Sequence, residues 1–75
     1  MIQLDHFNSI LSCLHHCPHL IERIILNADA TIHHDPMTSI IKLARHHHIS
    51  IETVTKHEIQ SHYSLPARTQ LFALQ

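Results

Sequence analysis

Two segments of the chain carry apolar side chains at the i, i+3, i+4 and i+7 spacing that marks one buried face of a helix. The first predicts a helix over residues 7–17, which Pro18 ends because proline removes a backbone donor. The second predicts a helix that begins at Asp35-Pro36, with the aspartate as N-cap and the proline in the first turn. This helix is expected to end across His46–His48, because histidines suit the negative end of the helix dipole.

Short apolar or alternating runs predict the strands, and the run at residues 21–26 is also rich in β-branched residues. Such runs occur at residues 2–4, 21–26, 49–54 and 71–74. Before the last run, Thr55 and Glu58 match a capping box, which predicts a short third helix that ends near Tyr63.

Helices and strands therefore alternate along the chain, an order that favours a mainly parallel sheet covered by helices. We expect a small three-layer α/β/α sandwich, formed by a single domain over residues 1–75. A mass of 8.7 kDa corresponds to roughly 4,700 Å² of folded surface, which suits one small core.

Composition limits the function more than it limits the fold. Five Lys and Arg against six Asp and Glu leave a formal charge of -1, a weak electrostatic footprint for a nucleic-acid binder. Eleven histidines would add positive charge on mild acidification, because their ordinary pKa lies near ~6.5. A chain this short favours a binding module over a complete cofactor-dependent enzyme. It shows no signal peptide, membrane-spanning run or disulfide framework, so we expect a cytoplasmic location.

The chain contains no glycine, which excludes Gly-rich phosphate loops. Turns that need a positive φ must then use Asn, Asp or His, and we expect them at Asn27 and around Asp29. No serine or threonine lies in a nucleophile-elbow pattern, so no catalytic residue is predicted.

Five stretches of the chain resemble one known family in the order in which they occur. They are a first-helix stretch at 6–14, a strand at 21–26, a helix end at 40–45, a strand with its capped helix at 49–59, and a closing stretch at 68–73. Together they are similar to the N-terminal substrate-binding domain of SpoU/TrmH-type RNA 2′-O-ribose methyltransferases. The family has a glycine where this chain has His6, and its closing His-Gln-Gly is replaced here.

The resemblance implies a fold similar to the kink-turn-binding ribosomal proteins, with residues 1–75 as the N-terminal fragment of a longer methyltransferase. In that family, a separate knotted domain binds S-adenosylmethionine and transfers the methyl group. The present domain would then contain no cofactor site, and it would hold structured RNA, either ribosomal or transfer RNA, for the catalytic domain. This interpretation depends on a mainly parallel sheet, and a mostly antiparallel sheet would remove its structural basis.

RNA helices are recognised through their shape, phosphates and 2′-hydroxyls, so contacts need basic and polar side chains at one edge of the sheet. The candidate contact residues are Asn8, Arg23, His33, His34, Lys42, Arg45 and Arg68, with Lys56 as a further cation. Asn8, His33 and His34 are expected to cluster if the first helix begins beside the long polar loop. With so few cations, only about two or three phosphates would be neutralised.

Two other functions stay open at this point. The near-zero charge also fits an α/β protein-interaction module with no role in RNA binding. In a metal-binding domain, Cys13, Cys17 and His16 or His19 would supply thiolate and imidazole ligands to zinc. The competing interpretation is that Cys13, beside the apolar stripe, is a small buried side chain. Because paired Cys-x-x-Cys motifs are missing from the sequence, we predict no metal ligand.

Overall fold

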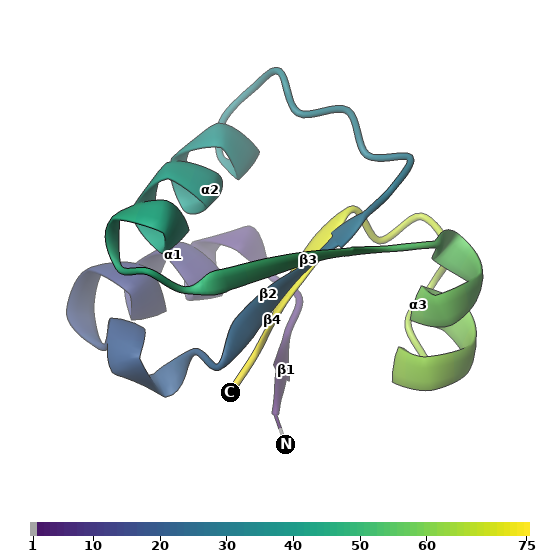
Figure 1. Cartoon of the computed structure of the whole chain (residues 1–75), viewed down its shortest axis with the longest axis horizontal. Coiled ribbons are helices and arrows are strands. Elements are labelled where there is room, and N and C mark those ends of the chain that lie inside the picture. The colour runs from purple at the N-terminus through teal and green to yellow at the C-terminus, as the bar shows by residue number, and fades with distance from the viewer. Residues whose placement is uncertain (1) are drawn as a thin grey trace.

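The computed structural model describes residues 2–75 and shows there a small α/β fold with three α-helices and a four-stranded sheet (Figure 1). The elements alternate in the order β1 (Gln3–Leu4), α1 (Phe7–His16), a 3₁₀ turn η1 (Pro18–Leu20), β2 (Arg23–Asn27), α2 (Met37–His46), β3 (Ser50–Val54), α3 (Lys56–Tyr63) and β4 (Leu71–Leu74). The predicted order of helices and strands is confirmed.

The sheet is mixed, and its strands lie side by side in the order β1-β4-β2-β3. Strands β2 and β3 are parallel, with Ile24 opposite Ile51. Strand β4 lies between β1 and β2 and is antiparallel to both, so that Ala73 faces Leu4 on one side and Ile24 on the other. The expectation of a mainly parallel sheet is therefore wrong, because two of the three pairings within residues 2–75 are antiparallel.

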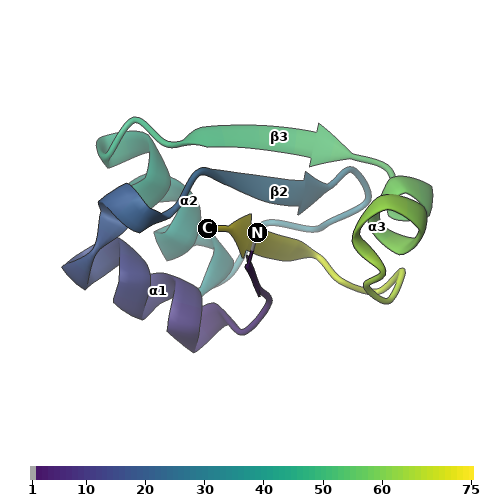
Figure 2. The same cartoon turned by 90° about the horizontal axis from the view of Figure 1, so that it is seen from below.

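The direction of β4 follows from the short third helix. Helix α3 begins with the predicted cap, in which Thr55 Oγ1 accepts a hydrogen bond from the Glu58 amide at 3.2 Å. Its eight residues span only about 12 Å, too little to carry the chain back along the sheet. Ser64 ends the helix with φ 56°, and the Leu65 amide donates to the Ile59 carbonyl. The chain re-enters the sheet from the end where β2 and β3 finish, so β4 runs back against them (Figure 2).

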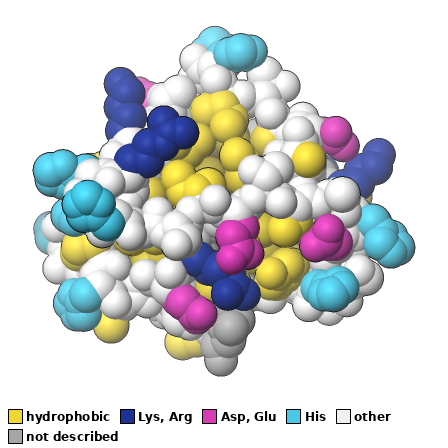
Figure 3. Space-filling model, in the orientation of Figure 1, with side chains coloured by type: hydrophobic (Ala, Val, Ile, Leu, Met, Phe, Trp, Pro, Cys, Tyr) yellow, Lys and Arg dark blue, Asp and Glu magenta, His cyan; other side chains and the backbone are white. Residues whose placement is uncertain are grey.

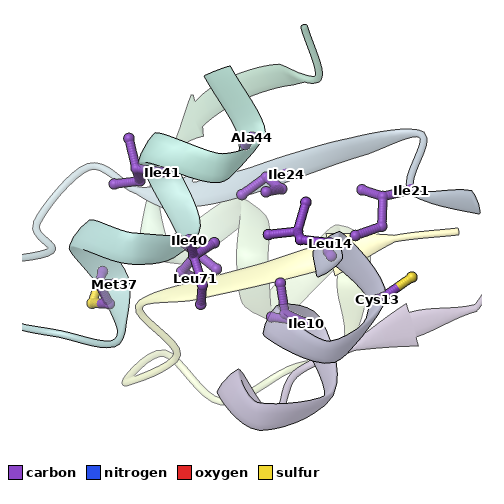
Figure 4. Close-up of a cluster of buried hydrophobic side chains, with 11 residues drawn as sticks. Ile10, Cys13, Leu14, Ile21, Ile24, Met37, Ile40, Ile41, Ala44 and Leu71 are labelled. Carbon is purple, nitrogen blue, oxygen red and sulfur yellow. The ribbon is translucent and has the colours of Figure 1, made fainter. Parts of the chain in front are cut away.

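Helices α1 and α2 lie together on one face of the sheet and form the larger of two cores (Figure 4). The predicted helical stripes are buried there: Ile10 and Leu14 of α1, and Ile40 and Ala44 of α2, have no exposed surface. They belong to one cluster with Ile24 of β2. Truncating one of the larger side chains in such a cluster to alanine costs about 2–5 kcal/mol of stability.

The opposite face of the sheet is covered less completely. Ile25, Phe72 and Leu74 point to this side and form a smaller cluster with Ile59, the one fully buried residue of α3. The ring of Tyr63 packs edge-on against Phe72, with ring centroids 4.9 Å apart. Helices thus pack on both sides of the sheet, but the second side carries one short helix near the end of the strands (Figure 2).

The positive-φ residues lie at helix ends and not in the turn after β2. Within residues 2–75, the left-handed conformation occurs at His48 (φ 58°) and Ser64 (φ 56°), just beyond α2 and α3. The expectation for Asn27 and the stretch around Asp29 is therefore wrong. Helices commonly end on a left-handed residue, and in a chain without glycine a histidine and a serine take that position.

Helix α2 begins one residue later than the sequence predicts. Met37 is its first residue and Pro36 takes the N-cap position, with no hydrogen bond from a capping side chain. Asp35 accepts hydrogen bonds from the hydroxyls of Thr38 and Ser39, at 2.5 and 2.6 Å. The aspartate therefore still ties down the first turn, through side chains in place of the expected backbone cap.

The dimensions agree with those of one folded unit. The accessible surface is 4741 Å², close to the value of roughly 4,700 Å² that follows from the mass. The radius of gyration is 11.3 Å, against about 11 Å for a compact chain of this length. Across the described part of the chain, the helices lack the length and apolar character that crossing a bilayer requires.

Candidate nucleic-acid interface

One end of the sheet gathers the starts of all three helices. Strands β1, β2 and β3 run in the same direction and a helix follows each of them, so the chain leaves the sheet toward all three helices at the same end. Figure 2 shows α3 beside the ends of β2 and β3, and α1 and α2 on one side of the sheet. The loop before β4 reaches this end too, because β4 runs the opposite way. We call this region the carboxyl edge and define it as residues 5–7, 27–37, 55–56 and 66–70. Helix N-termini and strand ends of this kind commonly bind anionic ligands in α/β folds.

Asn27, the last residue of β2, holds two loops of the carboxyl edge together. It is 6% exposed, and its Nδ2 donates to the carbonyls of Ala67 at 3.2 Å and Thr69 at 3.0 Å. Its Oδ1 accepts from the amide of Asp29 at 2.9 Å, which shapes the turn after β2. Both polar atoms of the side chain are thus satisfied, and the loop that carries Arg68 is anchored to the end of the sheet.

A shallow cavity of about 350 Å³ opens beside this anchor. Lys56 at the start of α3 and Arg68 in the loop before β4 both line it, together with Asp29 and Gln70. Two cations, one from the first turn of α3 and one from the loop before β4, therefore border one cavity, and Gln70 adds an amide side chain to its wall. This arrangement fits an anionic ligand with neighbouring hydroxyl groups, such as a ribose-phosphate backbone.

The expected cluster of Asn8, His33 and His34 is divided between two places. Phe7 and His34 line one cavity of about 290 Å³, so α1 does begin beside the long loop. His33 and His34 are exposed, with ring centroids 6.4 Å apart. Asn8, however, lines a different cavity, the one that also contains Cys13. The two histidines thus belong to the carboxyl edge together with Arg68, whereas the Asn8 side chain lines the cavity beside Cys13.

The charge of the carboxyl edge is close to balance when its histidines are neutral. Its cations are Lys56 and Arg68, and its carboxylates are Asp5, Asp29 and Asp35. Within the described residues, neither cation has a carboxylate partner within 4 Å. Both cations are therefore available to an incoming phosphate, while the three carboxylates limit the strength of its attraction.

Arg23 lies at the other end of the sheet, at the start of β2. Its guanidinium is 3.5 Å from the Glu22 carboxylate and 3.7 Å from that of Glu52. Hydrogen bonding to Tyr63 raises the pKa of Arg23, and the charge of Glu52 raises it further. Arg23 is thus engaged within the domain, in contrast to Arg68.

Lys42 and Arg45 are both exposed and lie three residues apart on α2, outside the carboxyl edge. Figure 3 shows the Lys and Arg side chains of one face in separate groups, with histidines at the margins and acidic side chains beside the lower group. The seven predicted contact residues therefore occupy several places on the molecule, and they form no single basic patch on this face.

The two cysteines do come together, as the metal-binding alternative requires. The Sγ atoms of Cys13 and Cys17 are 3.4 Å apart. Burial raises the pKa of the Cys13 thiol, and the hydrogen bond with Cys17 adds to the rise. Within residues 2–75, however, the His, Cys, Asp and Glu side chains form no group of three that could hold a metal ion. The imidazoles of His16 and His19 thus complete no three-ligand zinc site with these sulfurs.

The sequence interpretation missed the role of Asn27 as the anchor of the edge. The sequence does contain an indication of this role, because Asn27 directly follows the apolar run of residues 24–26. Since strand side chains alternate, Asn27 shares a face with the buried Ile25, and a polar side chain on a buried face needs partners. The loop that provides those partners is far away in the sequence, so they could not be named in advance.

Comparison with known proteins shows the class of fold. No protein-family model matches the chain, and no curated protein matches it significantly. A solved structure of a Bacillus halodurans protein of unknown function is similar, with a TM-score of 0.68 and 12% sequence identity over 96% of this chain and 69% of that one. At this identity the similarity concerns the fold alone. The chain is thus a small α/β domain with a mixed four-stranded sheet.

Proposed function

We propose that this domain binds structured RNA through the carboxyl edge and serves as the substrate-recognition part of an RNA-modifying protein. The observation that carries the proposal is the pair Lys56 and Arg68, which border one cavity from the start of α3 and from the loop that Asn27 anchors. Contacts of this kind bind the sugar-phosphate backbone and set the orientation of the RNA.

The narrower proposal names the enzyme that the domain serves. In it, the RNA is ribosomal or transfer RNA, and a separate SpoU-type domain, which uses S-adenosylmethionine, methylates a ribose 2′-hydroxyl in the cytoplasm. The present chain supplies no catalytic residue to that reaction. The resemblance to SpoU-type methyltransferases was expected to include a mainly parallel sheet, and the sheet is mixed. The narrower proposal therefore rests on the five similar stretches of sequence alone.

The affinity for RNA is expected to be low and to depend on salt. Two available cations correspond to about two neutralised phosphates, a small contribution from counterion release. Binding should therefore weaken as the salt concentration rises.

An NMR titration of the ¹⁵N-labelled domain with stem-loop fragments of ribosomal RNA tests the proposal. It should be run at low salt, at both pH 6 and pH 7.5. We expect amide shifts at residues 27–37, 55–56 and 66–70, with smaller changes elsewhere. The proposal fails if millimolar RNA shifts no resonance at either pH, or if the shifts lie only outside the carboxyl edge.

A pair of double variants provides a matched control, since each variant removes one lysine and one arginine. Lys56→Ala with Arg68→Ala should weaken RNA binding about tenfold, the scale expected for losing two phosphate contacts. Lys42→Ala with Arg45→Ala removes the exposed pair on α2 and should leave the affinity within about twofold. A stronger effect of the second variant would place the interface on α2.

A protein-interaction module is the second candidate function, and the exposed edge of the sheet favours it. Strand β3 pairs with β2 on one side only, so its outer backbone groups are open to another strand. Ile2 and Leu20 are also large apolar side chains that remain 60% and 50% exposed. Concentration-dependent mass from light scattering, together with no RNA-induced shifts, would support this function in place of RNA binding.

A further inference from the structure

The two cysteines lie together where helix α1 ends. Cys13 is in the last turn, and Cys17 follows the helix with φ -148°, so the chain leaves the helical path at that residue. The Cys17 amide still donates to the Cys13 carbonyl at 2.7 Å, which holds the second cysteine close to the first. The two Sγ atoms are consequently 3.4 Å apart, in direct contact.

The inner side of this thiol pair is packed and its outer side is open. Cys13 is 6% exposed and belongs to the larger core, and Figure 4 shows its sulfur at the margin of the labelled cluster. Cys17 is half-buried. Both residues line a shallow cavity of about 460 Å³, together with His16 and Gln75. The Nε2 atom of Gln75 also lies 3.8 Å from the Cys13 Sγ and donates to it.

We propose that Cys13 and Cys17 form a two-sulfur binding site for Cu(I), separate from the RNA interface. Soft thiolate ligands select Cu(I) among the common transition-metal ions. With metal–sulfur bonds of about 2.3 Å, the length in zinc–thiolate sites, trigonal coordination places two sulfurs about 4 Å apart. The sulfurs of Cys13 and Cys17, at 3.4 Å, therefore have to separate by roughly 0.6 Å when Cu(I) binds between them with an external thiol as the third ligand.

Coordination replaces the protons of the two thiols. Cu(I) binds both sulfurs as thiolates, two protons pass to the solvent, and the site changes from neutral to a charge of minus one, with no change of oxidation state. Structural zinc requires four ligands, whereas Cu(I) is stable with two or three. This difference decides between the ions, because the described residues bring together two sulfurs and no group of three ligands. The open cavity leaves a third position for an external thiol.

An anaerobic competition titration tests this site. The purified protein, with both thiols reduced and counted, is titrated into Cu(I) held by the chromogenic chelator bathocuproine disulfonate. We expect the wild type to withdraw one Cu(I) per chain and to develop a sulfur-to-copper charge-transfer band in the ultraviolet. X-ray absorption at the copper edge should then show sulfur as the main scatterer.

The matched controls separate thiol binding from capture by the eleven histidines. Cys17→Ser removes one ligand at a half-buried position and should weaken Cu(I) binding by more than about 100-fold. A residue that only supports a metal ligand typically costs about 10- to 100-fold when it is mutated, so a larger loss identifies Cys17 as a ligand. His47→Ala with His48→Ala should retain wild-type binding. Circular dichroism confirms that each variant is folded. The proposal is overturned if folded Cys17→Ser competes as well as the wild type, or if the wild type withdraws no copper.

Discussion

The two ends of the sheet both carry an arginine, but they use it in opposite ways. At the start of β2, Arg23 lies between the carboxylates of Glu22 and Glu52, at 3.5 and 3.7 Å. At the carboxyl edge, Arg68 has no such partner among the described residues, and it shares a cavity with Lys56. The difference lies in the neighbours that the fold provides, since the two side chains are chemically identical.

The comparison shows which basic residues of a nearly neutral domain can bind an anion. Arg23 has two counter-charges within the domain, so a phosphate would have to compete with them. Arg68 has no carboxylate within 4 Å among the described residues, and the hydrogen bonds of Asn27 hold its loop in place. A fixed loop lowers the entropic cost of binding, because less of the chain has to be ordered when the ligand arrives.

The largest expected effect comes from the anchor of the carboxyl edge. Asn27→Ala leaves the carbonyls of Ala67 and Thr69 without their donor, so we expect the free energy of unfolding to fall by about 3 kcal/mol. Urea denaturation measures this loss. Asn8→Ala removes an exposed asparagine and should change the same free energy by less than about 0.5 kcal/mol. Equal values for the two variants would show that Asn27 is no anchor.

A second prediction concerns the salt dependence of RNA binding. With two phosphates neutralised, the logarithm of the association constant should fall with the logarithm of salt concentration with a slope of about -1.5. Lys56→Ala with Arg68→Ala should reduce this slope to near zero without changing the urea midpoint. Fluorescence anisotropy at several salt concentrations gives both slopes. An unchanged slope in the variant would show that these cations meet no phosphate.

The opposite end of the sheet should show the reverse behaviour. Arg23→Gln removes the charge that lies between two carboxylates, and we expect a small loss in the free energy of unfolding. The loss should shrink at high salt, because ion pairs are screened. RNA affinity should stay the same, as measured by the same anisotropy assay. A large drop in affinity with unchanged stability would reverse the roles of the two arginines.

The smallest effect is expected at the start of α2. The hydroxyls of Ser39 and Thr38 donate to Asp35 and hold the pKa of its carboxyl below the ordinary value. A carboxyl whose pKa is lower in the folded state adds stability above its unfolded pKa, near ~3.9, and loses it as the pH falls through the folded value. Asp35→Asn should therefore be less stable than the wild type at pH 6, with the difference shrinking as the pH falls through the folded-state pKa of Asp35. A difference in urea midpoint that is constant over this range would exclude the carboxylate as its source.

The apolar stripes and the capping residues were sufficient to predict where the elements lie. The stripes of α1 and α2 are buried as expected, and Thr55 caps α3 through the Glu58 amide. These features are local, because each is set by residues within one or two turns of the chain. The expectation of a mainly parallel sheet was wrong because the direction of β4 is not set locally. This direction depends on how far α3 carries the chain, and the alternation of helices and strands holds no information on that distance.

The candidate interface was also predictable only in part. Arg68, His33 and His34 were named from their residue types, and the structure places all three at the carboxyl edge. Arg23 was named on the same grounds, but it is paired with two carboxylates. Residue type shows which side chains can meet a phosphate, whereas their availability also depends on neighbours such as Glu52, which a different strand brings to Arg23.

The sequence by itself determined the content of this protein: its elements, the buried stripes, the near-zero charge and the small set of cations. Only the tertiary structure decided the order of the strands, the pairing of Arg23, and the meeting of Lys56 and Arg68 beside Asn27. The physical reason is the range of the interactions. Helical periodicity and caps act between near neighbours in the chain. Sheet pairing joins residues that are far apart in the chain, from Arg23 with Ser50 (27 positions) to Gln3 with Leu74 (71 positions), and these contacts form only when the whole core packs.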